Sequence, residues 1–457
     1  MQKNLARLKL ELNARIIRPA QINMCSRIVI AYSGGLDSHV LLHLCASGKQ
    51  IKNKLTAVYI NHGLQKEANA WAKHCESICH ELGVKFQAIN VNAVAAPGES
   101  PEEAARNARY AALMPLLGKD DALLVAQHVD DQLETVLLQL FRGSGLKGLS
   151  GMPSSMPFGS GLLIRPLLDV SKDDIIRYAN DHALNWINDP SNQHTAFDRN
   201  YLRHDILPLI KKRWPSIDLT VSRSATHCAE AQTIISTLAD ELLASAMHTD
   251  KTLDINALHN QSASYQALII RQWFQVLGLK MPGQRIVKQI LEQVITAKTD
   301  ANPIVATQGH QIRRYRQRLY CIKPQQIITM MDGVLTCDQM SFSVTDNIRY
   351  EVMPSTDGIN VEQWNNARIT INFRSGGESI CLPGRTGTHS LRKLFQEAGV
   401  PPWERGLIPL VYLDGKLAAV GELWIAAGFF SKANGCCVRL NKRELTVKGN
   451  DGTANID

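Results

Sequence analysis

The chain has 457 residues, of which 45% are hydrophobic and 20% are charged; at about 100–200 residues per domain, this length predicts two to four globular domains. The formal net charge of +8 suits a polyanionic partner such as RNA, although many other soluble enzymes are equally basic. No nonpolar stretch reaches the roughly 20 residues of a membrane span and the N-terminus has no apolar signal core, so we expect a cytoplasmic protein without a membrane partner.

Strand and helix patterns alternate over the first two hundred residues. Short buried strands are predicted at Arg27–Tyr32, Leu55–Ile60, Val84–Val91 and Ala122–Gln127. Helical patterns separate them at Asp37–Cys45, Glu67–Leu82 and Pro101–Leu117, the last opened by the capping box Ser100-Pro101-Glu102-Glu103. Such alternation predicts a parallel, doubly wound sheet that binds ligands beyond the carboxyl ends of its strands.

The stretch "SGGLDS", residues 33–38, follows the first predicted strand at that edge. Its two glycines permit positive φ and let backbone N–H groups converge on an anion, and the next helix begins near Asp37. The hydroxyls of Ser33 and Ser38 add hydrogen-bond donors. A plain glycine turn capped by Asp37 and Ser38 is the alternative. Asp37 favours the phosphate interpretation. A carboxylate repels a bound phosphate unless a divalent cation such as Mg²⁺ lies between them, so its presence here suggests a nucleotide bound with Mg²⁺.

The cysteines show no disulfide framework. The ten cysteines include Cys75 and Cys79, flanked by His74 and His80, but no C-x-x-C motif. Four-residue spacing on a predicted helix without a second ligand pair favours buried free thiols over a metal site. Free thiols agree with a reducing cytoplasm.

Two arginines lie on the helix predicted over the sheet. Arg106 and Arg109 occur in "EEAARNARY", residues 102–110. Solvated surface side chains and a contact to pyrophosphate remain equal alternatives for them.

Three acidic residues begin the helix that follows the fourth strand, in "HVDDQLET", residues 128–135. Val129, Leu133, Val136, Leu137, Leu140 and Phe141 form one apolar face, which places Asp130 and Glu134 on the opposite face with Asp131 adjacent. These acids could simply complement the helix dipole. Three of them beside His128 exceed that need, so we expect a cluster that holds metal, binds a cationic substrate group or accepts a proton.

Basic residues follow in two segments. "RGSGLKG", residues 142–148, contains Arg142 and is either a phosphate contact or a plain helix C-cap. The segment 186–214 interleaves cations, including Arg199 and Arg203, with aromatic rings. This pattern suits RNA phosphates and stacked bases, or a helix with one solvated charged face.

Changes in composition along the sequence predict three domains. We expect a catalytic domain over 1–215, a mainly helical middle domain over 216–330 that ends in a basic strand, and a small α/β domain over 340–448. The basic strand "RRYRQR", residues 313–318, is either an RNA contact or an exposed strand edge that resists aggregation. The tail 449–457 is expected to fray.

The motif S-G-G-x-D-S at 33–38 identifies the chain as similar to the PP-loop ATP pyrophosphatases, whose N-terminal domain has an adenine nucleotide alpha hydrolase-like fold. Within that superfamily it resembles the tRNA(Ile)-lysidine synthase family over nearly its whole length. The resemblance is carried in order by "INHGL" at 60–64, "ARNARY" at 105–110, 128–152, "RPLL" at 165–168, 187–203 and 382–412.

The resemblance implies an ATP-dependent ligase that modifies the wobble cytidine of tRNA(Ile) with a CAU anticodon. ATP adenylates the cytidine O2 and releases diphosphate; the ε-amine of L-lysine then attacks C2 and expels AMP. The implied diphosphate cradle consists of Ser33, Gly34, Gly35, Leu36 and Ser38. Asp37 would bind Mg²⁺, with Arg106 and Arg109 assisting.

The same resemblance assigns the acids to the amine. Asp130, Asp131 and Glu134 would bind the lysine ammonium or remove its proton, in an order that the sequence leaves open. RNA contacts are expected from Arg142, Arg199 and Arg203, and from Arg392, Lys393 and Arg405 of the last domain, beside Phe395 and Trp403. A homodimer is one alternative for the oligomeric state.

Three other functions are alternatives. A glutamine-fed PP-loop amidotransferase usually carries a separate glutaminase unit with a nucleophilic cysteine, and the sequence shows no convincing one. A PP-loop tRNA thiolase needs reactive cysteines, yet no cysteine lies inside the phosphate or acidic motifs. A non-catalytic RNA-binding protein would be expected to have lost Asp37 or the acidic cluster, and both are present.

Overall fold

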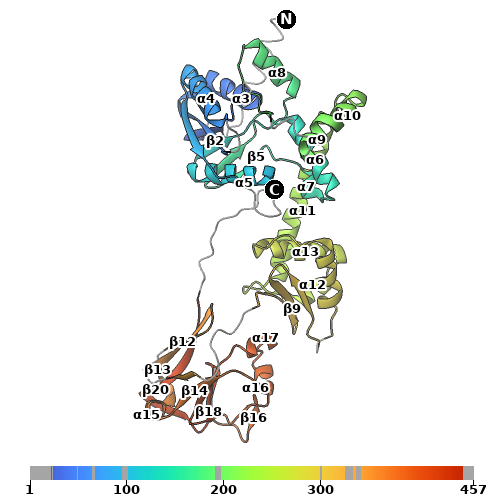
Figure 1. Cartoon of the computed structure of the whole chain (residues 1–457). Helices are drawn as coiled ribbons and strands as arrows, with labels where there is room; N and C mark the ends of the chain where they lie inside the picture. Colours follow the sequence, from blue (N-terminus) through green and yellow to red (C-terminus); the bar gives the residue numbers. More distant parts are fainter. Residues whose placement is uncertain are drawn as a thin grey trace. The chain divides into compact units, whose positions relative to one another are not determined.

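The computed structural model describes residues 22, 24–48, 50–63, 67–94, 101–190, 197–298, 301–324, 333–335 and 341–445 (Figure 1). The chain forms two compact units, Met1–Leu238 and Ala239–Asp457. The three-domain division expected from the sequence stays a prediction. The expected capping box at Ser100 and the expected fraying of 449–457 lie outside the described residues.

A six-stranded sheet forms the centre of the first unit, in the order β3-β2-β1-β4-β6-β5. Its strands are β1 (Arg27–Ala31), β2 (Leu55–Asn61), β3 (Lys85–Asn90), β4 (Asp121–Leu124), β5 (Ser155–Phe158) and β6 (Gly161–Ile164). All neighbours pair in parallel except β5, which is antiparallel to β6. The predicted parallel sheet is confirmed. The prediction of a buried third strand is wrong, because β3 lies at the sheet edge and is largely exposed.

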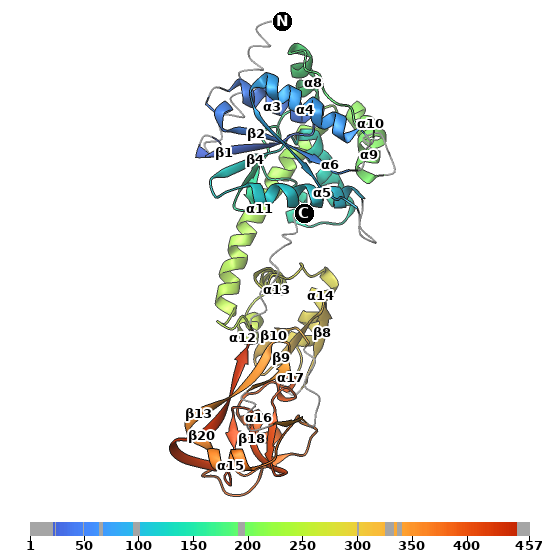
Figure 2. The same cartoon turned by 60° about the vertical axis from the view of Figure 1, so that its left-hand side comes forward.

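Helices cover both faces of this sheet (Figure 2). The helices α3 (Leu36–Ser47) and α4 (Ala68–Leu82) lie on one face, and α5 (Pro101–Leu113) lies on the other. On the α3 face, Leu41 and Cys45 belong to the same buried cluster as Ile28 and Ile30 of β1. Apolar side chains on both faces of parallel strands therefore hold the doubly wound layers together.

Further helices complete the carboxyl edge of the sheet. They are α6 (Val129–Phe141), α7 (Leu146–Leu149), α8 (Lys172–Asp181), α9 (Asp198–Tyr201), a π-helical turn at Leu202–Ile206, and α10 (Leu207–Arg213). Leu133 of α6 is buried against Leu202 and Leu207. At the last turn of α6 the predicted apolar face is open to solvent, since Leu140 and Phe141 are 53% and 69% exposed.

The helix α11 (Ile217–Ala246) extends from the first unit into the second. The second unit continues with α12 (Ile255–His259), α13 (Ala263–Val276), α14 (Gln284–Gln289) and a π-helical turn at Ile290–Ile295. These helices pack on a four-stranded antiparallel sheet of β7 (Leu253–Asp254), β10 (Arg318–Ile322), β9 (His310–Tyr315) and β8 (Ile304–Thr307), in that order. Within "RRYRQR", Arg313 pairs with both β8 and β10, whereas Arg314 and Tyr315 pair with β10 alone, so both alternatives for this segment stay predictions.

The last part of the chain contains small antiparallel sheets and short helices. One sheet has the order β11 (Gly333–Leu335), β14 (Ile369–Asn372), β17 (Leu410–Leu413), β18 (Lys416–Val420) and β19 (Trp424–Ile425). A second pairs β12 (Ser341–Thr345), β13 (Ile348–Asn360) and β20 (Phe430–Glu444), and a third pairs β15 (Ser379–Ile380) with β16 (His389–Ser390). The helices are α15 (Val361–Asn366), α16 (Leu391–Glu397) and α17 (Pro402–Arg405). Among the described residues, each helix is too short or too polar to span a bilayer.

Candidate active site

The loop between β1 and α3 is held by hydroxyl groups. The Ser38 hydroxyl donates to Gly35 O at 3.0 Å and accepts from the Ser33 backbone N–H at 3.2 Å. The two serine hydroxyls lie 3.0 Å apart. Ser33 is exposed, and the first turn of α3 presents N–H groups that have no carbonyl partner within the helix. These hydroxyl and N–H groups are of the kind that bind an anion at a helix N-terminus, and phosphate binding by the loop stays a prediction.

Gly34 has a conformation that a residue with a side chain would strain. Its φ is +78°, and an added Cβ would lie 2.5 Å from Ile187 Cδ1 and 2.8 Å from Cys75 Sγ. Ile187 N–H also donates to Gly34 O at 2.9 Å. Segments far apart in the sequence thus clamp the loop, and the glycine is required both for its φ and for its lack of a side chain.

We expect Gly34→Ala to reduce the free energy of unfolding by about 1–2 kcal/mol for its left-handed φ and by a further 1–3 kcal/mol for overpacking. Urea unfolding measures this change. The matched control is Gly309→Ala, because Gly309 has φ +77° and nothing within 4 Å of the added Cβ. Equal losses in the two variants would contradict the steric part of the prediction.

His128 connects the loop to the acidic helix. Its Nδ1 accepts from the Asp130 backbone N–H at 3.3 Å, so a neutral ring carries its proton on Nε2. Nε2 lies 3.4 Å from Asp131 Oδ2 and 3.7 Å from Asp37 Oδ2. His128 is 4% exposed, and this buried ring lies next to both the Asp37 carboxylate and Asp131 of the acidic cluster.

Glu134, which is predicted on the side of α6 opposite its apolar face, is fully buried. Its Oε1 accepts from Arg203 Nε at 2.6 Å, and its Oε2 accepts from Arg199 Nε at 3.1 Å. Burial alone would lower the pKa of the Arg203 guanidinium, but the hydrogen bond and charge of Glu134 raise that pKa above its ordinary value. The two arginines that we expected on RNA are therefore bonded inside the site, because a buried carboxylate needs a paired charge. A contact of either with RNA stays a prediction.

The other two acids also have cationic partners. Asp131 accepts from Arg203 Nη2 at 3.0 Å and from the His128 backbone N–H at 3.0 Å. Burial would raise the pKa of the Asp131 carboxyl, but its interactions with His128 and Arg203 lower it below its ordinary value. Asp130 Oδ2 accepts from Lys211 at 2.7 Å, whereas its Oδ1 is buried with no partner among the described residues.

Asp37 forms an ion pair that the sequence analysis did not include. Lys172 Nζ lies 2.5 Å from Asp37 Oδ1, and the two side chains are each 32% exposed. The only feature of the sequence that could have singled out Lys172 is its place at the start of a helix, where a cation is unusual. It directly follows Ser171, whose hydroxyl caps α8 by accepting from the Asp174 N–H. The sequence analysis likewise assigns no role in the site to Lys211, which lies in the basic segment 186–214. Groups of three or more metal-ligating residues are absent from the described ranges.

His62 and the two arginines of α5 border the same edge of the sheet. Burial, together with the nearby Arg109 charge, lowers the pKa of His62 to about 4. The Arg106 guanidinium lies 5.1 Å from the centre of the Tyr110 ring, and Arg109 is exposed. Their contact with pyrophosphate stays a prediction.

The pKa of His62 predicts a pH dependence of stability. Because the folded protein holds this ring neutral while the unfolded chain titrates near 6.5, we expect stability to fall as the pH drops from about 6.5 toward 4. His62→Gln should flatten that part of the profile in urea unfolding at several pH values. The control for loss of an imidazole is the exposed His227→Gln. Identical profiles for His62→Gln and wild type would contradict the prediction.

Other residues noted in the first unit have local roles. Arg142 is exposed and forms the C-cap of α6, with its N–H on Leu138 O. Cys75 and Cys79 are free and fully buried, and the structure thereby favours free thiols over a metal site.

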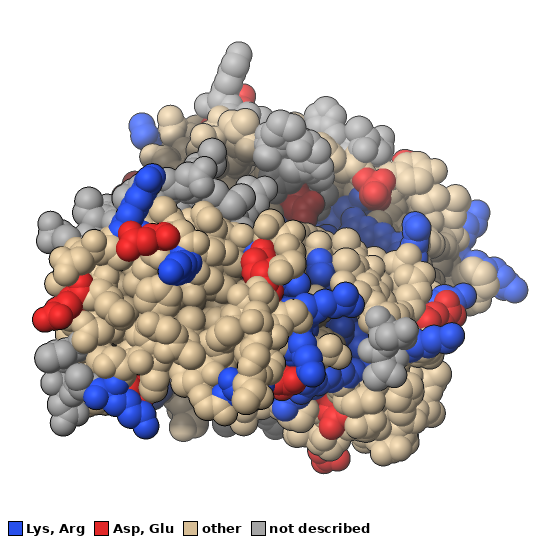
Figure 3. Space-filling view, turned by 90° about the horizontal axis from the view of Figure 1, so that it is seen from below, with Lys and Arg blue, Asp and Glu red and all other residues tan. Residues whose placement is uncertain are grey.

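The structure separates the basic residues predicted in the last part of the chain. Arg392 and Lys393 on α16 are exposed. Arg405 instead donates to Val400 O at 2.9 Å, and its guanidinium lies 6.0 Å from the centre of the Tyr315 ring. Figure 3 shows Lys and Arg side chains gathered in one area of the face seen from below.

The aromatic residues expected beside these cations are held within the second unit. Phe395 is fully buried, with its ring centre 5.2 Å from that of Trp424. The Trp403 ring has its centre 5.1 Å from that of Tyr320. Arg314 of the basic strand donates to Ile295 O at 2.8 Å. Phe395 is therefore part of the core and is not available to stack on a base.

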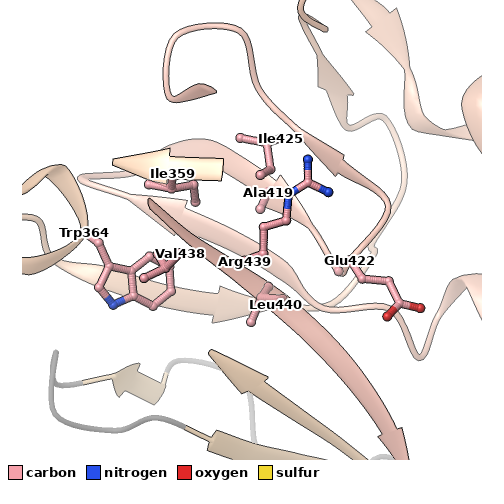
Figure 4. Close-up of a pocket in the computed structure, with 9 residues that line it drawn as sticks. Ile359, Trp364, Ala419, Glu422, Ile425, Val438, Arg439 and Leu440 are labelled. Carbon is pink, nitrogen blue, oxygen red and sulfur yellow. The ribbon is translucent and has the colours of Figure 1, made fainter. Parts of the chain in front are cut away.

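A pocket in the second unit does not suit a substrate (Figure 4). Ile359, Trp364 and Val438 supply apolar walls, with Arg439 and Glu422 also lining it. Arg439 is already paired with Asp357 at 3.0 Å. The cavity measures about 10 Å³, which is room for about one water molecule.

Known families match the chain along most of its length. The matching models are described as PP-loop domain over residues 8–210, TilS substrate binding domain over 253–320, and TilS substrate C-terminal domain over 369–442. The relatives named tRNA(Ile)-lysidine synthase include proteins from three bacteria. That of Methylococcus capsulatus is 39% identical over 88% of this chain and 92% of its own. Those of Coxiella burnetii and Photobacterium profundum are 38% and 40% identical, covering 89% and 90% of this chain and 91% and 95% of their own.

Proposed function

The chain belongs to the tRNA(Ile)-lysidine synthase family, and from that membership we propose that it joins L-lysine to C2 of the wobble cytidine in tRNA(Ile) with a CAU anticodon, at the expense of ATP. The product, lysidine, changes codon reading from AUG to AUA and the charging identity from methionine to isoleucine. The observation that carries the proposal is His128, whose Nε2 lies within 3.7 Å of Asp37 and 3.4 Å of Asp131. Nucleotide activation and amine binding can therefore occur at one point.

In the first step the cytidine O2 attacks the α-phosphate of ATP, and diphosphate leaves. We assign the leaving diphosphate to the N–H and hydroxyl groups of 33–38, with Arg106 and Arg109 as further cationic contacts. Asp37 fits Mg²⁺ as a single carboxylate, because this ion is usually held by one or two carboxylates together with substrate phosphates and water. When bound, Mg²⁺ offsets the charge that develops on the phosphates.

In the second step the lysine ε-amine attacks C2 and AMP leaves. An ammonium with a pKa of about 10.4 must lose a proton before it can attack at neutral pH. We assign its binding and deprotonation to Asp130, Asp131 and Glu134. Asp130 Oδ1, which is buried and without a partner among the described residues, supports a role for Asp130 as the proton acceptor.

The tRNA is the largest partner, and its phosphates require exposed cations. We assign Arg392 and Lys393 of α16 and Arg142 after α6 to these contacts, since all three are exposed. They position the RNA, whereas the chemistry stays in the first unit.

Removing the two exposed cations of α16 should weaken tRNA binding. We expect Arg392→Ala/Lys393→Ala to lower tRNA affinity and to reduce the slope of log K against log[salt] by about 1–2, since each lost phosphate contact removes about 0.7–0.9. Filter binding at several salt concentrations measures this, with ATP affinity expected to stay unchanged. Arg177→Ala/Lys288→Ala removes two exposed cations elsewhere and serves as the control. An unchanged salt slope would exclude α16 from the RNA contact.

The deciding experiment incubates the protein with ATP, Mg²⁺, labelled lysine and tRNA transcripts. We expect covalent lysine on tRNA(Ile) with the CAU anticodon and none on the methionine tRNA that shares this anticodon. Label on neither tRNA, or incorporation of sulfur instead, would overturn the proposed function.

A further inference from the structure

Lys172 occupies a position that helix stability does not explain. It is the first residue of α8, where the partial positive charge of the helix dipole disfavours a cation. Asp173 and Asp174, which follow it, are the residue type that this end prefers. The reason for a lysine at this position must therefore be a contact with another part of the fold.

That reason lies across the carboxyl edge of the sheet. Lys172 Nζ is 2.5 Å from Asp37 Oδ1, a contact between residues 135 apart in the sequence. Both side chains are about one third exposed, so the pair adds little to stability and opens at low cost. The ammonium nevertheless lies at the mouth of the loop 33–38.

The other cations near this point are more firmly bound. Arg203 donates to both Glu134 and Asp131, and Lys211 pairs with both Asp130 and Asp218. For Lys172, the ion pairs of the described residues include Asp37 alone. Its four-carbon stem makes it the cation that is able to move.

An incoming nucleotide changes the electrostatics of this pair. The polyphosphate carries several negative charges and would lie beside the Asp37 carboxylate, which repels it. An ammonium that leaves Asp37 for the phosphates would supply attraction where the repulsion arises. It would also free the carboxylate for a divalent cation.

Building on the proposed function, we propose that Lys172 is a phosphate-binding residue that is held by Asp37 in the empty site and transfers its ammonium to the polyphosphate of ATP when the nucleotide binds. Asp37 is then the residue that keeps Lys172 in place between turnovers. Lys172 thus binds the nucleotide, whereas the acidic residues of α6 bind the ε-amine of the substrate lysine.

The test measures ATP affinity by calorimetry in buffer without divalent cations, for wild type, Lys172→Gln, Asp37→Asn and Asp37→Asn/Lys172→Gln. A phosphate contact predicts that Lys172→Gln raises the Kd about tenfold in the Asp37→Asn background, and at least as much there as in wild type, because no ion pair has to open first. Lys172→Arg should retain most of the affinity. Arg177→Gln, on the same helix and 60% exposed, controls for the loss of a positive charge.

Equal Kd values for Asp37→Asn and the double variant would overturn the inference, since Lys172 would then act only through Asp37. If that result accompanies normal incorporation of labelled lysine into tRNA, the inference fails and the proposed function stands. If Lys172→Gln raises the Kd as expected but wild type modifies no tRNA, the proposed function fails and the phosphate contact stands. A wild type without measurable ATP binding in this buffer would overturn the inference, because the Lys172 ammonium would then supply no measurable attraction. The proposed function, which includes Mg²⁺, would stand.

Discussion

Asp37→Asn is expected to lower the rate of lysidine formation about a thousandfold, because charge stabilisation at a transferring phosphate supplies several kcal/mol of the barrier reduction. The carboxylate belongs to the segment 33–38 and lies in the first turn of α3. Its Oδ2 is 3.7 Å from His128 Nε2. Its amide analogue keeps the shape of the side chain but provides no anionic oxygen for a divalent cation. The measurement is the initial rate of labelled lysine incorporation into tRNA(Ile) at saturating ATP.

The control for this variant is Asp173→Asn, which removes an exposed carboxylate from the first turn of α8. We expect it to retain nearly full activity. Asp37→Asn should also retain its tRNA affinity, because the exposed cations assigned to RNA are unchanged. Product formation within a few-fold of wild type by Asp37→Asn would exclude Asp37 from the phosphoryl chemistry.

Glu134→Gln is expected to lower the free energy of unfolding by about 3–5 kcal/mol, since removing one charge of a buried ion-paired group leaves the others uncompensated. Glu134 has no exposed surface and holds both Arg199 and Arg203. The glutamine can keep part of the hydrogen bonding but leaves two guanidinium groups without their shared carboxylate. Urea unfolding at pH 7 measures the change, and lysidine formation should be lost with it.

A surface pair gives the matched comparison. Glu292→Gln makes the same chemical change at a carboxylate that is 61% exposed and pairs with Lys288. Its cost should stay within about 1 kcal/mol, as for other exposed ion pairs. If Glu134→Gln costs no more than Glu292→Gln, the buried cluster is not the electrostatic centre that the geometry indicates.

The features that sequence analysis predicted correctly are local ones. The strands β1, β2 and β4, the helix α3 and the loop at 33–38 lie where the pattern placed them, to within a few residues. Each depends on apolar periodicity or on glycine conformation, which neighbouring residues determine. The family motifs also follow one another along this chain in the same order as in the family, and that order can be found without tertiary information.

The omissions in the site concern long-range pairing. The buried Glu134, its two arginine partners and the contact of Lys172 with Asp37 join residues 65, 69 and 135 apart in the sequence. The core position of Phe395 beside Trp424 is of the same kind. A charged or aromatic side chain looks the same in a sequence whether it faces solvent or an opposite charge, because desolvation and Coulomb energy depend on which segments the fold brings together. The sequence by itself therefore determined which chemistry the chain carries, and only the tertiary structure decided which charges meet.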